Sequence, residues 1–170
     1  MGAIVKGYNF VLNALAVCSG IVIFVAFLMI VIDVSIRILG FSPPAFTIAI
    51  TEYILLYFTI LAAPWLVRQK GHVFIDAVTQ FLPPAVKWFT AKIAYLLCIC
   101  SASIFCYFST QLFFDALAAG ILDVRGIDMP QWSLYAPMPV GFAMVAIEFL
   151  RYLVGIDDMY ATSLAEREGM

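Results

Sequence analysis

The chain has 170 residues, of which 65% are hydrophobic and only 12% are charged, and its formal net charge is −2. Soluble domains usually carry roughly twice that share of charged residues, so the composition indicates a protein that has lipid as part of its solvent. The small net charge excludes a broad basic surface for nucleic acid, and the length leaves no room for a separate soluble enzyme domain.

The first element in chain order is an apolar stretch over residues 8–39. A secretion signal can begin in the same way, since Lys6 precedes the apolar run. This run is too long for a signal core, however, so we expect it to remain as the first membrane-spanning helix. At about 1.5 Å per residue it exceeds the thickness of a bilayer, and we expect it to tilt, bend or project.

Three further apolar stretches are each long enough to cross a hydrocarbon core, which takes roughly 20 helical residues. They cover residues 46–67, 84–119 and 132–154, and glycines and prolines separate them. Their hydrophobicity is continuous rather than alternating, which favours helices over a barrel. The sequence therefore predicts an all-α integral membrane protein, with one membrane domain over residues 1–170 and four transmembrane helices.

Residues 72–82, between the second and third stretches, have a different pattern. Apolar side chains recur at helical spacing, and most polar side chains fall on other faces, which is typical of a short amphipathic helix in the membrane interface. An ordinary connecting loop is the alternative. The residues that define this predicted interfacial helix are His72, Phe74, Asp76, Val78 and Phe81.

The distribution of lysine and arginine predicts the orientation in the membrane. With both termini in the cytoplasm, the inner side would hold seven of these residues and the outer side only Arg37 and Arg125. We therefore expect both termini to be cytoplasmic. Four positive side chains near the inner surface are candidates for contacts with lipid phosphates: Arg68, Lys70, Lys87 and Lys92.

Charged residues within the helices invite a functional explanation, because a charge in the membrane is costly. Asp33 and Arg37 are four residues apart, and Glu52 lies at a similar depth across the first hairpin. This cluster could be a substrate or ion site, or an ion-pair clasp that holds helices or a partner subunit. Its place near the outer ends and its near-neutral charge favour the clasp. Glu148 and Arg151 form a similar pair near the inner surface, as candidates for capping or partner docking.

Residues that could perform catalysis or hold a metal are scarce. His72 is the only histidine, which excludes a bis-histidine haem site within one chain and leaves too few ligands for zinc. A nucleophile, base and orienting group that include a histidine cannot be assembled, and the sequence has no phosphate-binding glycine loop. We therefore expect no catalytic residue, no metal and no cofactor in this chain, which should not be an enzyme.

Four short motifs occur in an order that covers nearly the whole chain, and together they resemble the small, four-helix Q-type permease subunit of tripartite ATP-independent periplasmic (TRAP) transporters. The first two lie at the first hairpin, the third follows the second helix, and the fourth leads into the last helix. They are Asp33–Arg37, Thr51–Tyr53, Arg68–Asp76 with Phe81–Pro83, and Met129–Trp132 with Pro137–Phe142.

The resemblance implies a role and a location. Such a subunit pairs with a large permease subunit in a bacterial or archaeal cytoplasmic membrane, among membrane lipids. The large subunit binds sodium and moves an organic acid, a carboxylate or sulfonate, that a periplasmic binding protein delivers. The small subunit would be a fixed scaffold in which Asp33, Arg37 and Glu52 hold helices in register and none of them contacts substrate.

Two other interpretations remain open from the residues. A small four-helix transporter could work alone as a dimer, with Glu52 as its coupling carboxylate, although this residue lies near a helix start. The chain could also anchor a haem or quinone oxidoreductase in the membrane, although its single histidine argues against haem.

Overall fold

In the computed structural model, the described residues are 2–42, 44, 46–69, 83–124 and 128–156. Four helical segments within them are long and apolar enough to cross a membrane: Lys6–Ile38, Phe46–Arg68, Trp88–Ala119 and Gln131–Val154. The predicted all-α membrane fold is therefore confirmed for this part of the chain. The segment predicted as an interfacial helix, residues 72–82, lies outside the described residues.

The helices follow the apolar stretches of the sequence, although α1 begins at Gly2 rather than at residue 8. Their bounds are Gly2–Ile38 for α1, Phe46–Arg68 for α2, Pro84–Ala119 for α4, Gln131–Tyr135 for α5 and Pro137–Val154 for α6. Gly120 and Gly155, with φ of 60° and 82°, follow α4 and α6 in the left-handed conformation. Glycine adopts this conformation at little cost, which explains why the two helices stop there.

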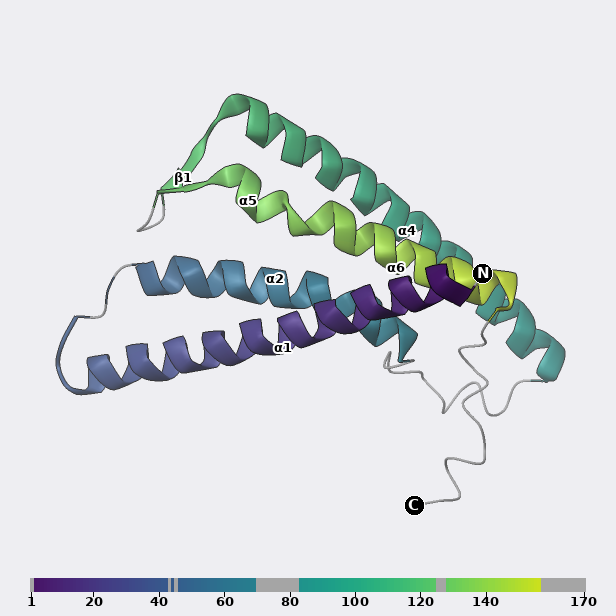
Figure 1. The fold of residues 1–170 in the computed structure, drawn as a ribbon, viewed down its shortest axis with the longest axis horizontal. Coiled ribbons are helices and arrows are strands. Elements are labelled where there is room, and N and C mark those ends of the chain that lie inside the picture. The colour runs from purple at the N-terminus through teal and green to yellow at the C-terminus, as the bar shows by residue number, and fades with distance from the viewer. Residues whose placement is uncertain (1, 43, 45, 70–82, 125–127, 157–170) are drawn as a thin grey trace, which may run out of the picture.

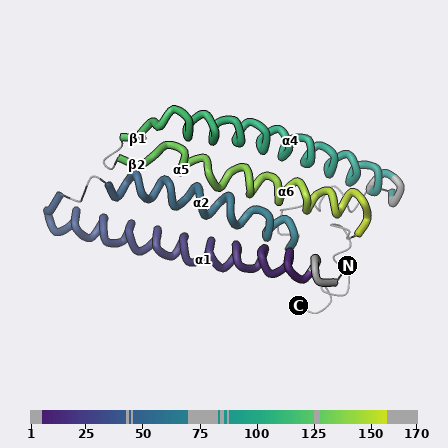
Figure 2. The backbone as a smooth tube through the Cα atoms, turned by 45° about the horizontal axis from the view of Figure 1, so that its top comes forward, coloured from purple at the N-terminus to yellow at the C-terminus, as the bar shows by residue number. Residues whose placement is uncertain are grey.

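The long helices lie side by side as a single layer in the order α1, α2, α6 and α4 (Figures 1 and 2). The main helix contacts are accordingly between α1 and α2, between α2 and α6, and between α4 and α6. As edge helices, α1 and α4 each have one main neighbour and leave many large apolar side chains exposed, among them Phe24 and Phe105. Such a layer suits a bilayer, where exposed apolar side chains meet lipid rather than water.

The connection before α5 is more ordered than the predicted loop. Strands β1 (Leu122–Val124) and β2 (Asp128–Pro130) form a two-stranded antiparallel sheet in which Asp123 lies opposite Met129. Strands of three residues are too short to produce a recognisable alternation of polar and apolar residues. The sequence reading therefore missed this hairpin.

The fourth span was predicted as one helix and is divided by Ala136 into α5 and α6. Pro137 follows the division and has no backbone N–H to continue the hydrogen-bond ladder. Ala136 nevertheless keeps helical angles, with φ −52° and ψ −43°, and α5 leads directly into α6 (Figure 1). The two segments together supply one span across the layer.

Buried apolar side chains concentrate at one end of the layer, where α2 and α6 end. This core contains Val67 from α2, Ala91 and Tyr95 from α4, and Phe149 and Tyr152 from α6. We call this the clasp end. The opposite end, where α1 connects to α2 and where the β-hairpin lies, is called the hairpin end.

Candidate functional site

A fully buried carboxylate lies at the clasp end. The side chain of Glu148 in α6 is 1% exposed. Arg151 Nη1 donates a hydrogen bond to Glu148 Oε2 over 2.9 Å, and Arg68 Nη1 at the end of α2 lies 3.7 Å from Glu148 Oε1. One buried negative charge thus faces two positive charges, one on its own helix and one on the neighbouring helix, which offsets the cost of removing the carboxylate from water.

Other side chains at the clasp end donate hydrogen bonds to the last carbonyl oxygens of neighbouring helices. The Tyr152 hydroxyl donates to the carbonyl oxygens of Val67 over 2.9 Å and Arg68 over 3.3 Å. Lys92 Nζ from α4 donates to the carbonyl oxygens of Tyr152 and Leu153. The last carbonyls of a helix have no partner within it and carry partial negative charge, so each contact satisfies a helix end with a side chain from another helix.

The first helix reaches the same region through an aromatic ring. Arg68 Cζ lies 5.8 Å from the centre of the Tyr8 ring, within the range of a cation–π contact. Residues of all four long helices therefore meet at this end. We call Arg68, Lys92, Glu148, Arg151 and Tyr152 the carboxylate clasp.

Several residues that were predicted to contact a partner subunit or lipid at the inner surface have partners within this chain. Glu148 and Arg151 were docking candidates, but Glu148 faces the interior of its own chain rather than a docking surface. Arg68 and Lys92 were candidates for lipid phosphates, and the structure gives both side chains partners within the chain. Lys70, and the side chain of Lys87, lie outside what the structure describes.

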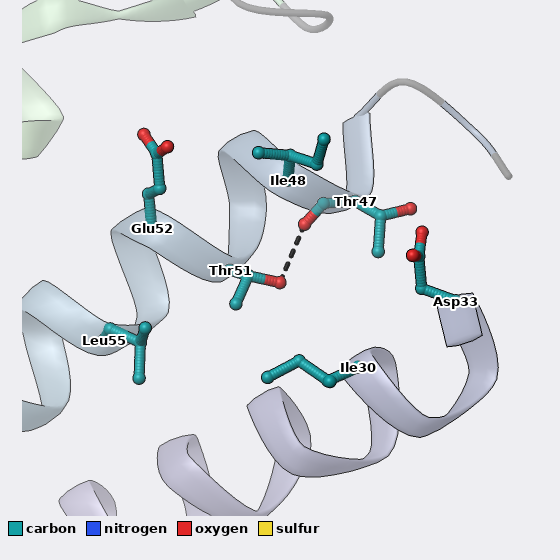
Figure 3. Close-up of a pocket in the computed structure, with 7 residues that line it drawn as sticks. All are labelled: Ile30, Asp33, Thr47, Ile48, Thr51, Glu52 and Leu55. Atoms are coloured by element: carbon teal, nitrogen blue, oxygen red, sulfur yellow. Dashed lines mark hydrogen bonds between the residues drawn. The ribbon is translucent and has the colours of Figure 1, made fainter.

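At the hairpin end, the structure brings together two of the three residues in the predicted cluster. Arg37 Nε donates to Asp33 Oδ2 over 2.8 Å, one helical turn apart on α1. The exposed Glu52 carboxylate on α2 points away from Asp33 (Figure 3). The Asp33–Arg37 pair therefore lies within α1 and does not by itself connect two helices.

Two tyrosines of α2 make the connections across the layer near the hairpin end. Tyr53 donates to Asp123 Oδ2 over 3.1 Å, and Tyr57 donates to the Ser133 carbonyl over 2.6 Å. The sequence reading assigned neither tyrosine a bonding role. Their spacing of four residues within an apolar run places both hydroxyls on one face of α2, and buried tyrosines usually find a partner. The four-residue spacing of two tyrosines in an apolar run is therefore the sequence pattern from which these two hydrogen bonds could have been predicted.

Helices α2 and α6 approach most tightly at a glycine. A Cβ atom added to Gly141 would lie 2.3 Å from Ile60 Cγ2 and 2.9 Å from the Ile60 carbonyl oxygen. Pro64, four residues after Ile60, lacks the N–H that this carbonyl would otherwise accept. In lipid a neighbouring helix must cover such a backbone group, and only a residue without a side chain allows this close approach.

Within the part of the chain that the structure describes, no group of three or more histidine, cysteine, aspartate or glutamate residues could hold a metal ion. The clasp instead has the chemistry of an internal support. It pairs charges and caps helix ends, and its carboxylate is enclosed by its own chain.

Comparisons with known proteins identify the family of this chain. Residues 11–157 match the family described as tripartite ATP-independent periplasmic transporters, DctQ component. The C4-dicarboxylate TRAP transporter small permease protein DctQ of Pseudomonas aeruginosa is 32% identical over 112 residues, which are 64% of this chain and 52% of that protein. The sialic acid TRAP transporter permease protein SiaT of Haemophilus influenzae is 26% identical over 141 residues, which are 82% of this chain and 22% of that protein.

The chain thus spans about half of one relative and about a fifth of the other. No solved structure matches it. The family match covers most of the chain, including three of the membrane-length helices completely and the first from residue 11 onward. As predicted, the chain is a transporter component rather than an enzyme: it belongs to the DctQ-component family of the tripartite ATP-independent periplasmic transporters.

Proposed function

We propose that this chain is the stationary membrane subunit of a TRAP transporter and supports a large permease subunit that carries the substrate. The observation that carries the proposal is the placement of charge. The middle of every long helix is uncharged, over residues 7–32, 53–67, 93–114 and 131–147. Transport sites for anions usually place polar or charged groups, or broken helices, near the middle of the bilayer.

The contacts between helices support the stationary role. The carboxylate clasp holds α2, α4 and α6 at one end, and Tyr53 and Tyr57 attach α2 to β1 and α5 toward the other. Gly141 packs directly against the backbone of α2 between them. A layer held at both ends and in the middle resists sliding of one helix past another, which a support must do.

The relatives suggest the partner and the class of substrate. One is named for C4-dicarboxylates and the other for sialic acid, and both compounds are carboxylic acids. The Haemophilus influenzae permease continues far beyond the region that matches this chain. We propose that a large permease subunit supplies the substrate and sodium sites, and that a periplasmic binding protein delivers an organic acid.

We also propose that the protein lies in the bacterial inner membrane with both termini in the cytoplasm, as the lysine and arginine distribution favours. A green fluorescent protein fused to the C-terminus should then fluoresce in cells, and alkaline phosphatase fused there should be inactive. The reverse pattern would contradict this orientation.

The stationary role can be tested by locking the layer. In a variant without native cysteines, Tyr53→Cys and Asp123→Cys would be joined across α2 and β1 by a short bis-methanethiosulfonate reagent, which forms a reducible disulfide with each cysteine and releases methanesulfinate. Uptake of a labelled C4-dicarboxylate or of sialic acid would be measured in proteoliposomes that contain the chain, the large permease and the binding protein. We expect the cross-linked complex to retain most of the uptake of the same variant after reduction.

The control carries one cysteine, Tyr53→Cys alone, and receives the same reagent. Loss of uptake on cross-linking, recovered on reduction and absent from the control, would show that the layer must move and would contradict the stationary role. Proteoliposomes that contain only this chain should show no uptake. Uptake by this chain alone would instead support the self-contained transporter.

A further inference from the structure

A pocket of about 210 Å³ lies between α1 and α2 at the hairpin end. Apolar side chains of both helices form part of its wall, and the Asp33 carboxylate points toward α2 near Thr47 (Figure 3). The lining residues are Ile30, Asp33, Thr47, Ile48, Thr51, Glu52 and Leu55. The residues that line this pocket belong neither to the carboxylate clasp nor to the helix contacts that support the stationary role.

The pocket contains a buried oxygen that lacks a donor. Asp33 Oδ2 accepts the hydrogen bond of Arg37, whereas Asp33 Oδ1 is buried and has no hydrogen-bond partner. Buried polar atoms in folded proteins are nearly always paired, and an unpaired carboxylate oxygen is among the costliest to bury. This oxygen can therefore accept a hydrogen bond from a donor that the described residues do not supply.

The two threonines in the wall can offer only acceptors. The Thr47 hydroxyl donates its hydrogen to the Pro44 carbonyl over 2.9 Å, and the Thr51 hydroxyl donates to the Thr47 carbonyl over 2.7 Å. Each hydroxyl has one hydrogen, so the lone pairs remain to accept. Together with Asp33 Oδ1 they form a set of acceptors with negative charge. A fitting ligand donates several hydrogens and is positively charged, as a primary ammonium group is.

We propose that this pocket binds the ammonium head group of an aminophospholipid such as phosphatidylethanolamine. Asp33 lies five residues before the end of α1, about 7.5 Å along the helix. The head-group layer on each side of the hydrocarbon has a similar depth of about 5–8 Å, so a lipid beside the end of α1 can bring its head group to Asp33. The side chain of Arg37 is 53% exposed, so its remaining guanidinium donors can meet the lipid phosphate.

The apolar part of the wall decides between a lipid and a bare cation. Ile30, Ile48 and Leu55 line the pocket beside the acceptors. A hard metal ion prefers about six oxygen ligands, and hydrocarbon supplies none of them. An aminophospholipid uses both surfaces, because its ammonium group meets the oxygens and its acyl chain lies against the apolar residues.

The test compares lipids with different head groups on the full chain. The purified protein would be stripped of lipid in detergent and titrated with phosphatidylethanolamine or phosphatidylcholine of matched acyl chains, and bound lipid counted by native mass spectrometry. The trimethylated choline head group has no N–H to donate. We expect about tenfold weaker binding of phosphatidylcholine, as loss of one charge-assisted hydrogen bond predicts.

Variants locate the site. Asp33→Asn should remove the preference for phosphatidylethanolamine, and Thr51→Val, which keeps the Asp33–Arg37 pair, should reduce it. The matched control is Asp115→Asn, an exposed carboxyl on α4 outside the pocket lining, which should keep the full preference. Helical circular dichroism would show that each variant is folded.

Three results would overturn the proposal. One is equal binding of the two lipids to the unchanged protein, and another is a preference that survives in folded Asp33→Asn and Thr51→Val. The third is competition by sodium ions or by water-soluble glycerophosphoethanolamine at concentrations matched to the lipid, because the pocket would then select a free cation or a soluble amine.

Discussion

The two ends of the helix layer contain similar charged residues in different settings. At the clasp end, Glu148 is buried and pairs with an arginine on another helix as well as one on its own. At the hairpin end, Asp33 pairs within α1 with an arginine whose side chain is half exposed. Both are a carboxylate beside an arginine one turn away, yet only the first joins helices.

The difference teaches that sequence spacing identifies an ion pair but not its purpose. A pair at i, i+3 or i, i+4 forms wherever a helix forms, since the helix itself supplies the geometry. Its energetic value depends on what else surrounds it, because exposed pairs contribute little whereas removing one member of a buried pair is costly. Substitutions at the two ends should therefore differ in effect.

The largest effect is expected from Glu148→Gln. The amide keeps the shape of the side chain but leaves Arg68 and Arg151 without a negative partner. We expect the free energy of unfolding in mixed micelles to fall by about 2–4 kcal/mol, somewhat less than for a fully enclosed pair because both arginines are partly exposed.

The control for this prediction is the double variant Glu148→Gln with Arg68→Gln. Removing a positive charge together with the negative one should recover part of the lost stability. If Glu148→Gln unfolds at the same denaturant concentration as the unchanged protein, the buried carboxylate does not hold the helices together.

An intermediate effect is expected midway between the two ends, from Gly141→Ala. The added methyl group would overlap the side chain and backbone of Ile60, so α2 and α6 must separate. Overpacking of this kind costs about 1–3 kcal/mol, measured in the same unfolding assay. The matched control is Gly20→Ala on α1, where nothing lies within 4 Å and where the alanine should be neutral or stabilising. Equal effects of the two substitutions would argue against the close helix contact.

The smallest effect is expected from Arg37→Gln at the hairpin end. This change removes an ion pair within one helix whose arginine is half exposed, and pairs that water screens in this way contribute about 0–1 kcal/mol to stability. The unfolding free energy should move within that range, and less at high salt, because ions screen exposed charges. A loss as large as that of Glu148→Gln would erase the contrast between the two ends.

Much of the fold could be predicted because continuous apolar runs in a membrane protein must be helical. Residues 46–67 and 84–119 were predicted as helices, and the structure has α2 at Phe46–Arg68 and α4 at Pro84–Ala119. The β-hairpin and the division at Ala136 were missed. Both depend on local backbone geometry over three to five residues, which is too short to produce a periodic pattern.

The candidate site was predicted in part. Glu148 and Arg151 were identified as a pair, and Arg68 and Lys92 as positive residues near the same surface, but not as members of one cluster. The distance in sequence between Arg68 and Glu148 carries no sign that the residues meet. Glu52 shows the opposite case, since it is near Asp33 across a short hairpin but points away from it (Figure 3).

The sequence by itself determined that the chain forms four membrane-length helices, that charge is confined to their ends, and that its motifs resemble the TRAP small subunit. These properties follow from composition, run length and local spacing. Only the tertiary structure decided the order of helices in the layer, the burial of Glu148 and the unpaired oxygen of Asp33. The reason is physical: the rotation of each helix about its axis decides which side chains meet, and packing against the other helices sets that rotation.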